Sequence, residues 1–200
     1  TWVKEGEREQ LQYGNMLHTA MAVRIEKNTP LPPAFATHEK WIDKLFQFNG
    51  HDVRSLPNLR TLVEQKFAIT KELAACEFFD NDAWYRGIGD VVWVAGPIAY
   101  VGDWKTGKIV EDSVQLALMA QCVFSRYPDV QVVRSEFIWL KEDAVTRADY
   151  TRTDMLSLWS SLQPRLASLE HSSKTTTYPA NPGALCRRWC PVKSCPHNGE

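Results

Sequence analysis

Two carboxylates and an amine lie close together near the middle of this 200-residue chain. Asp90 is followed, thirteen residues later, by the triplet Asp103-Trp104-Lys105. Carboxylate oxygens are ligands that Mg²⁺ and Mn²⁺ prefer, and such an ion polarises a phosphoryl oxygen and lowers the pKa of water. Lys105 is expected to stay cationic, because nearby opposite charge favours the charged form. These residues therefore predict metal-dependent hydrolysis of a phosphodiester.

Both acidic residues lie in segments with the composition of paired β-strands. The two halves of 85–105 are rich in Val, Ile, Trp and Tyr, and Gly96-Pro97 separates them. This pattern predicts a hairpin whose strands are buried on both faces. Charges in such a setting are costly unless they neutralise one another or bind an ion. A solvated pair between Asp103 and Lys105, without a catalytic role, is the alternative interpretation.

Further residues around the hairpin support a functional site. Gly89 and Gly102 each precede an acidic residue, where a bare backbone would let a ligand approach closely. Thr106-Gly107 ends the second strand, and the segment 111–127 predicts a helix that begins with acidic residues. Gln115 is expected in the first turns of that helix.

The order and spacing of these motifs resemble the PD-(D/E)XK nuclease superfamily. The resemblance is to its RecB-type branch, which includes many phage exonucleases and the CRISPR-associated adaptation nucleases. The matching motifs are Gly14-x-x-x-His18, Glu64, Gly89-Asp90, Asp103-Trp104-Lys105 and Gln115-Leu116-x-Leu118. The chain departs from the family at Met119, which stands where the branch often has the Tyr of Gln-x-x-x-Tyr.

The resemblance implies roles for the hairpin residues. Asp90 and Asp103 would bind the catalytic metal, with the carbonyl of Trp104 as a further oxygen ligand. Lys105 would orient or deprotonate the attacking water and counter the charge that develops at the phosphate. Because Lys105 should stay charged, we favour the orienting and charge-stabilising role over that of a free base.

The resemblance also implies roles outside the hairpin. His18 would be a ligand to a metal nearer the leaving group, Glu64 an outer or weaker ligand, and Gln115 would position the metal site or the DNA backbone. With at most one imidazole, this set favours one or two Mg²⁺ or Mn²⁺ ions over zinc. A structural role for His18, on the amphipathic helix predicted at about 4–26, is the alternative.

The C-terminal segment carries a second candidate metal site. Cys186, Cys190 and Cys195 fall within ten residues of a Pro- and Gly-rich tail and precede His197. Tight spacing of this kind argues for a metal rather than for disulfides. With His197 these cysteines can close a Cys₃His zinc site, and with a distant cysteine they can hold a [4Fe–4S] cluster. Plain reduced thiols are the third interpretation.

The origin of a fourth cysteine for such a cluster is open. The resemblance implies a cysteine upstream of His18, and the sequence, which begins at Thr1 without a Met, contains none there. We therefore expect an upstream segment before Thr1. Cys76 or Cys122 can substitute, although Cys122 is expected in the core.

Length and composition indicate one globular domain. The resemblance implies that residues 1–180 form a nuclease domain, and we expect the Cys-rich segment 181–200 to pack on it. Hydrophobic residues make up 44% of the chain and no apolar run approaches ~20 residues, so we expect no membrane span. With no visible signal peptide, a cytoplasmic location in a bacterium or phage-infected host is expected. The net charge of −1 does not indicate a basic DNA-binding protein, so local patches would have to bind phosphates.

The element pattern predicts an α/β fold with a mixed central β-sheet flanked by helices. The resemblance refines this to a restriction-endonuclease-like αβββαβ core. The expected helices lie at about 4–26, 39–48, 111–127 and 152–170, and the expected strands at 61–70, in the hairpin 85–105 and at 130–140.

These observations predict a divalent-metal-dependent DNA nuclease, and we favour an exonuclease. DNA would be the substrate, and a recombination or single-strand-annealing protein or a second copy of the chain would be the partner. Two alternatives stay open. One is a non-catalytic DNA- or protein-binding domain on the same scaffold, and the other is an iron–sulphur CRISPR adaptation nuclease.

Overall fold

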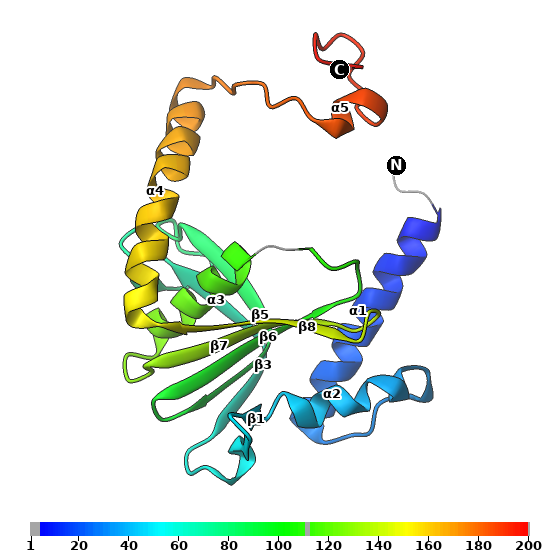
Figure 1. Ribbon diagram of the computed structural model, residues 1–200, viewed down its shortest axis with the longest axis vertical. Coiled ribbons are helices and arrows are strands. Elements are labelled where there is room, and N and C mark those ends of the chain that lie inside the picture. Colours follow the sequence, from blue (N-terminus) through cyan, green and yellow to red (C-terminus); the bar gives the residue numbers. More distant parts are fainter. Residues whose placement is uncertain (1–4, 111–112, 200) are drawn as a thin grey trace. The chain divides into compact units, whose positions relative to one another are not determined.

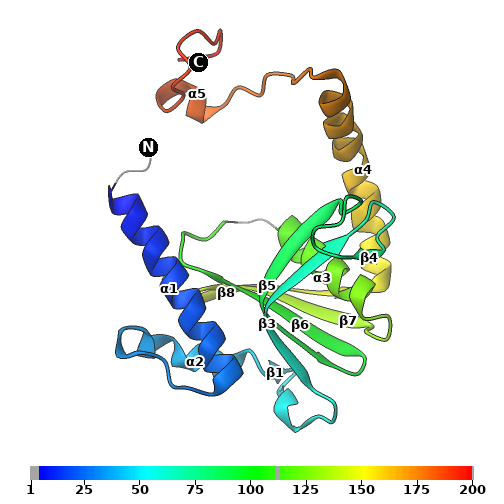
Figure 2. The ribbon, with the colours of Figure 1, turned by 180° about the vertical axis from the view of Figure 1, so that it is seen from behind.

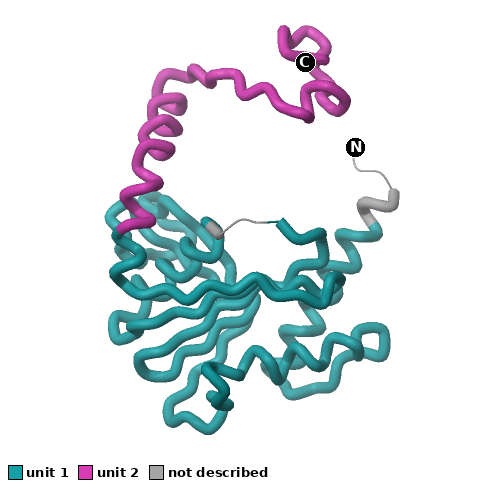
Figure 3. Tube along the Cα trace, viewed as in Figure 1, with its two compact units in different colours: residues 1–156 teal, residues 157–200 magenta. Residues whose placement is uncertain are grey.

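The computed structural model describes residues 5–110 and 113–199. The chain divides into two compact units, residues 1–156 and residues 157–200 (Figure 3). The first unit holds the whole β-sheet, and the second holds most of the last long helix and the Cys-rich segment. Packing of the segment 181–200 on the predicted nuclease domain stays a prediction.

The first unit is built on six strands. They are β3 (Arg60–Ile69), β4 (Ala75–Cys76), β5 (Tyr85–Ala95), β6 (Ile98–Lys105), β7 (Val132–Trp139) and β8 (Ala144–Thr151). They form one mixed sheet in the order β4-β3-β5-β6-β7-β8 (Figures 1 and 2). Only β6 and β7 pair in parallel, and α3 (Ser113–Arg126) makes the crossover that a parallel pair requires.

Helices flank this sheet, so the predicted mixed α/β fold is confirmed. The remaining elements are α1 (Glu5–Lys27), η1 (Pro33–His38), α2 (Glu39–Lys44), β1 (Gln47–Phe48), β2 (His51–Asp52), η2 (Val53–Ser55), α4 (Arg152–Thr175) and α5 (Ala184–Arg188). Leu17 of α1 and Trp41 of α2 share a buried cluster with Trp93 of β5. On β7, Phe137 packs instead with Leu116 of α3.

β5 and β6 form the predicted hairpin. Ala95 pairs with Ile98, which leaves Gly96 and Pro97 as a two-residue turn. Gly96 has a positive φ of 57°, which glycine adopts without strain. Residues 89–95 and 99–102 are all buried, so the prediction of strands covered on both faces is confirmed.

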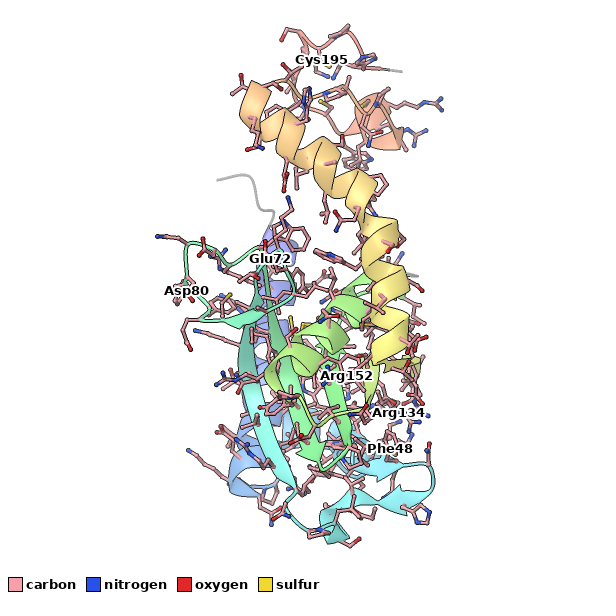
Figure 4. The ribbon with its side chains drawn as sticks, turned by 90° about the vertical axis from the view of Figure 1, so that its left-hand side faces the viewer. Phe48, Glu72, Asp80, Arg134, Arg152 and Cys195 are labelled. Carbon is pink, nitrogen blue, oxygen red and sulfur yellow. The ribbon has the colours of Figure 1, made fainter. Side chains whose placement is uncertain are left out.

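Edge strand β8 was not indicated by the sequence pattern. Its residues alternate between half-buried and exposed, and its charged side chains pair with β7. Arg147 bonds Glu136, and Asp149 Oδ2 lies 2.7 Å from Arg134 Nη2. Arg134 also lies over the ring of Phe48, at 4.3 Å (Figure 4). Because cross-strand charge pairs hold this strand, its sequence has little apolar character.

The helix predicted over 39–48 is shorter in the structure. α2 ends at Lys44, and Gln47–Phe48 form β1 instead. Asn49 and Gly50 have positive φ angles of 51° and 81° and form the tight turn between β1 and β2. An Asn-Gly pair is a strong hairpin signal, so the prediction was wrong for a reason that is visible in the sequence.

The other predicted helices and strands are present with boundaries shifted by a few residues. Glu111 and Asp112, expected in the first turn of the third helix, lie outside the described residues. None of the described helices is both long and apolar enough to cross a membrane.

Candidate metal centre

The candidate site lies where β5 and β6 part from one another. The last pair of their ladder is Val91 with Gly102. Beyond it, β5 continues beside β3, whereas residues 103–105 of β6 continue beside β7. Asp90 and Asp103 come directly after this last pair, one on each strand. The hairpin register therefore brings the two predicted carboxylates to the point where the strands separate.

Asp90 is the most enclosed of the acidic residues at the site, with 7% of its surface exposed. Its Oδ2 accepts a hydrogen bond from the backbone N–H of Trp104, at 2.7 Å, and its Oδ1 lies 3.2 Å from Nδ1 of His18. The bond from Trp104 fixes the carboxylate against β6. His18 thus lies beside Asp90, although the two are 72 residues apart, and its role as a metal ligand stays a prediction.

His18, Glu64 and Asp90 bring one ligand atom each to within 4.8 Å of the others. They come from α1, β3 and β5. Among the described residues, this is the one group of three or more His, Cys, Asp or Glu side chains with such spacing. An imidazole nitrogen and two carboxylate oxygens form a donor set that suits Mg²⁺ or Mn²⁺.

Glu64 reaches this group through a distortion of β3. The ladder with β5 pairs Val63 with Val91 and Gln65 with Gly89, and it omits Glu64 and Asp90. Glu64 has a φ of 48°, in the left-handed region that side-chain-bearing residues rarely adopt. Such strain inside a strand persists only where the surroundings impose it, and it is frequent at functional sites.

Replacing Glu64 with Gly is expected to raise the stability of the metal-free protein while weakening Mn²⁺ binding. A left-handed non-glycine residue costs roughly 1–2 kcal/mol, part of which Gly recovers, and the carboxylate near Asp90 is removed. Gln65→Gly, at an ordinary strand position, is the control and should lower stability by roughly 0.5–1 kcal/mol. Thermal unfolding in EDTA and Mn²⁺ titration measure both effects. A Glu64→Gly protein as unstable as Gln65→Gly would contradict the strain argument.

Asp103, Lys105 and Gln115 form a second group beside the first. Asp103 Oδ2 accepts hydrogen bonds from Nζ of Lys105, at 2.5 Å, and from Nε2 of Gln115, at 3.0 Å. The Lys105 ammonium also lies 4.7 Å from the ring centroid of Phe137. The ammonium is thus held at the site by a carboxylate and an aromatic face, and Gln115 orients the carboxylate. Metal binding by Asp103 itself stays a prediction.

The two groups are coupled electrostatically. Burial, followed by the charge of Asp90, raises the pKa of Asp103 to about 6, although Lys105 opposes the shift. Burial and the charge of Asp90 also raise the pKa of Glu64. The hydrogen bond with Asp90 raises the pKa of His18, against the effect of burial. Crowded carboxylates with shifted pKa values are typical of sites that bind cations.

The metal-free protein is expected to lose stability relative to Asp103→Asn as the pH rises from about 4 to about 6. In this window the folded state keeps a proton on Asp103, whose pKa is about 6, whereas the unfolded state, with a pKa of 3.8, has released it. Stability falls with rising pH wherever the folded state binds more protons, here by up to about 3 kcal/mol. Urea unfolding in EDTA across this range measures the difference. Parallel pH profiles for the two proteins would contradict the assignment.

Trp104 contributes through its backbone. Its side chain is buried in the core, with 2% of its surface exposed. Its N–H donates to Asp90. Because the N–H and C=O of one strand residue point to the same edge of the strand, we expect the carbonyl of Trp104 to face the space between β5 and β6 as well. Its role as an oxygen ligand stays a prediction.

The glycines next to the acidic residues do not leave room for a ligand, so that prediction was wrong. A Cβ on Gly89 would lie 2.8 Å from Cγ2 of Val92, and one on Gly102 would lie 2.6 Å from the hydroxyl of Tyr100. These positions are filled by neighbouring side chains. The small residues are therefore required by packing inside the sheet.

The first group lies at the wall of a large cleft. The cleft has a volume of about 1580 Å³ and is lined by α1, η1 and the segments that follow β6 and β7. His18 and Glu64 belong to its wall, as does Gly14, where an added Cβ would lie 3.4 Å from Oγ1 of Thr106. At the glycine of the G-x-x-x-H motif, α1 thus passes close to the end of β6. More than half of the described lining residues belong to α1, and the others come from segments far apart in the sequence.

Met119, which stands where the resembling nucleases often have a Tyr, lies in the core. Met119 has 5% of its surface exposed, and its sulphur and terminal methyl lie against Gly87 and Gly89. Cys122, one turn further along α3, is buried as expected. This part of α3 is core, so a DNA contact by residue 119 finds no support.

The tail cysteines lie in the second unit, whose last residues fold back on themselves. The N–H of Gly199 donates to the carbonyl of Cys186, and Nδ2 of Asn198 donates to that of Cys190, both at 3.0 Å. Cys186, Cys190 and Cys195 are half-buried, unbridged thiols. They do not belong to a group of three ligand atoms within 4.8 Å among the described residues.

Comparison of the chain with models of known protein families gives no match. Comparison with curated proteins gives none either. The relation to the PD-(D/E)XK nucleases is therefore a resemblance carried by the motifs themselves.

Proposed function

We propose that this protein is a divalent-metal-dependent DNA nuclease that hydrolyses phosphodiester bonds and acts as an exonuclease. One observation carries the proposal. His18, Glu64 and Asp90 converge within 4.8 Å where two buried strands part, next to a lysine held on a second carboxylate. A structural role alone gives no reason to gather three carboxylates and a histidine around a partly buried point, since burying charge is costly.

The residues present fit Mg²⁺ or Mn²⁺. Asp90, Glu64 and His18 would hold the ion. Asp103, which lies beside Asp90, and the carbonyl of Trp104 would supply further oxygen ligands. A divalent ion held there would polarise the phosphoryl oxygen and lower the pKa of the attacking water. The hydrogen bond from the N–H of Trp104 keeps the Asp90 carboxylate in one orientation, so little reorganisation is needed on binding.

Lys105 is proposed to orient the attacking water and to stabilise negative charge on the phosphate. Its ammonium lies 2.5 Å from Asp103, which fixes the side chain. Gln115 holds the same carboxylate oxygen from α3 and acts as a positioning residue. A preorganised cation of this kind is worth most at a site from which water is largely excluded.

A restriction-endonuclease-like core is proposed as the finer description of the fold. The elements α1, β3, β5, β6, α3 and β7 follow the order αβββαβ, and both predicted acidic positions lie on the β5–β6 hairpin. Strand β8 adds an antiparallel edge beside β7.

We propose that Cys186, Cys190 and Cys195 hold a metal centre. With His197 they can hold zinc, and with a distant cysteine they can hold a [4Fe–4S] cluster. Brown protein with visible absorption would support the cluster. Colourless protein with stoichiometric zinc would contradict it.

The nuclease proposal is tested with end-labelled linear and circular DNA in Mg²⁺ or Mn²⁺. Wild type should degrade linear DNA from its ends, and Asp103→Ala should not. Cleavage of the circle would replace the exonuclease mode with an endonuclease mode. Binding of DNA without cleavage in either metal would instead support the alternative, a non-catalytic binding domain.

A further inference from the structure

The cleft beside the metal centre is larger than a site for one small molecule. Pockets for small ligands have volumes of about 300–1,000 Å³, whereas this cleft measures about 1580 Å³. It runs along α1 from Glu9 to Thr19 and reaches Lys141, beyond the end of β7. Because His18 and Glu64 belong to its wall, a chain that occupies the cleft would pass directly by the metal ligands.

The described wall of the cleft carries few charges. Among the described residues that line it, Glu9, Glu64 and Lys141 are charged, and the other polar groups are amides, hydroxyls and imidazoles such as those of Gln10, Thr106 and His38. A protein that tracks a duplex needs several Lys or Arg side chains on phosphates, and this part of the wall offers one lysine. Neutral donors and acceptors suit the edges of unpaired bases instead.

An aromatic ring also lines the cleft. Tyr13 is 45% exposed, so nearly half of its surface is open to a ligand. Its ring packs edge to face against buried Phe35, with centroids 5.5 Å apart and an interplanar angle of 74°. Phe35 thus supports one side of the ring. Fixed aromatic rings are the platforms on which proteins stack single-stranded bases.

We infer that the cleft binds the unpaired bases of a single-stranded DNA end, stacked on Tyr13, while the adjacent phosphodiester lies at the metal centre. The inference rests on the proposed nuclease function and adds its substrate class. The low charge of the described wall does not oppose it, because a divalent ion at the metal centre and Lys105 would meet the phosphate that reacts.

The first test measures binding without cleavage. A short fluorescein-labelled oligonucleotide, single-stranded or annealed to its complement as a blunt duplex, is titrated with the full chain in EDTA and followed by anisotropy. The single strand should bind about tenfold more tightly or better, since stacking one base is worth about 1–3 kcal/mol. Equal or tighter binding of the blunt duplex would overturn the inference.

The second test removes the stacking ring. Tyr13→Leu keeps an apolar contact with Phe35 and should weaken single-strand binding about five- to hundredfold, whereas Tyr13→Phe should bind like wild type. Met16→Leu is the matched control, because Met16 is 62% exposed on the same helix and does not line the cleft. Equal loss in Tyr13→Leu and Met16→Leu, or no loss in either, would contradict the role of Tyr13.

Mn²⁺ binding and cleavage separate this inference from the proposed function. Wild type that binds Mn²⁺ and cleaves blunt duplex as fast as single strand contradicts the single-strand inference and leaves the nuclease proposal intact. Wild type that binds single-stranded DNA through Tyr13 but neither binds Mn²⁺ nor cleaves contradicts the nuclease proposal and supports the cleft assignment.

Discussion

Asp90→Asn is expected to abolish Mn²⁺ binding and to lower DNA cleavage by about a thousandfold or more. Asp90 is the buried member of the group formed with His18 and Glu64, and the other carboxylate in that group is exposed. Loss of outer ligand contacts already costs metal sites about 10–100-fold in affinity, so loss of this carboxylate should cost more. Losing the ion removes several kcal/mol of transition-state stabilisation.

The same substitution should leave the metal-free protein folded. The amide oxygen of Asn can still accept the hydrogen bond from Trp104, and the charge of Asp90, which raises the pKa of Asp103 and Glu64, is removed. The pKa of Asp103 should therefore fall toward its ordinary value in this variant. Isothermal titration with Mn²⁺, thermal unfolding in EDTA and a cleavage assay measure the three effects.

Asp129→Asn is the matched control, because it makes the same change of charge at an exposed position between α3 and β7. It should behave as wild type in all three measurements. Asp90→Asn protein that still binds Mn²⁺ with wild-type affinity would remove Asp90 from the metal site. Since the other proposed ligands are arranged around Asp90, the proposed centre would then have to be abandoned.

The β5–β6 hairpin could be predicted from sequence because its signals are local. The apolar runs and the Gly96-Pro97 turn fix its register, and the register places Asp90 and Asp103 next to one another. The position of Lys105 follows from the alternation of side chains along a strand, which places Lys105 on the same face as Asp103. This part of the site needed no knowledge of the rest of the fold.

The remainder of the site depends on contacts between distant segments. His18 was predicted from its motif, but its approach to Asp90 depends on where α1 crosses the sheet, and Gly14 is small where α1 meets Thr106. The left-handed φ of Glu64 has no sequence signal, since Glu is not a residue that favours that region. Tyr13 was equally hidden, because one aromatic residue on an amphipathic helix usually belongs to the core.

The three charges predicted to converge on one ion lie in two adjacent groups that are coupled electrostatically, and their sharing of one ion stays a prediction. Asp90 belongs with His18 and Glu64, and Asp103 belongs with Lys105 and Gln115. The charge of Asp90 raises the pKa of Asp103, so the groups are close enough to act together. This division suggests separate tasks, with the first group binding the ion and the second holding the cation that faces the phosphate.

If the second group holds the cation that faces the phosphate, Lys105→Ala should cause the second large loss of DNA cleavage. This variant should cleave DNA about 100- to 10,000-fold more slowly than wild type, the range typical of losing one acid–base or charge-stabilising group. Binding of Mn²⁺ and of DNA should persist, because Lys105 contacts Asp103 and Phe137 rather than His18, Glu64 or Asp90. Lys108→Ala is the control, since Lys108 is exposed three residues further along. Normal cleavage by Lys105→Ala would remove Lys105 from the mechanism.

Lys105→Arg distinguishes the two roles that remain open for the lysine. Arginine keeps the positive charge but does not lose a proton, so it can stabilise charge on the phosphate and cannot act as a base. If Lys105 works as a fixed cation, Lys105→Arg should retain clearly more activity than Lys105→Ala. Equal inactivity of both variants, with normal Mn²⁺ binding, would contradict the fixed-cation role and favour proton transfer. Because Asp103 holds the ammonium in place at 2.5 Å, we expect the first result.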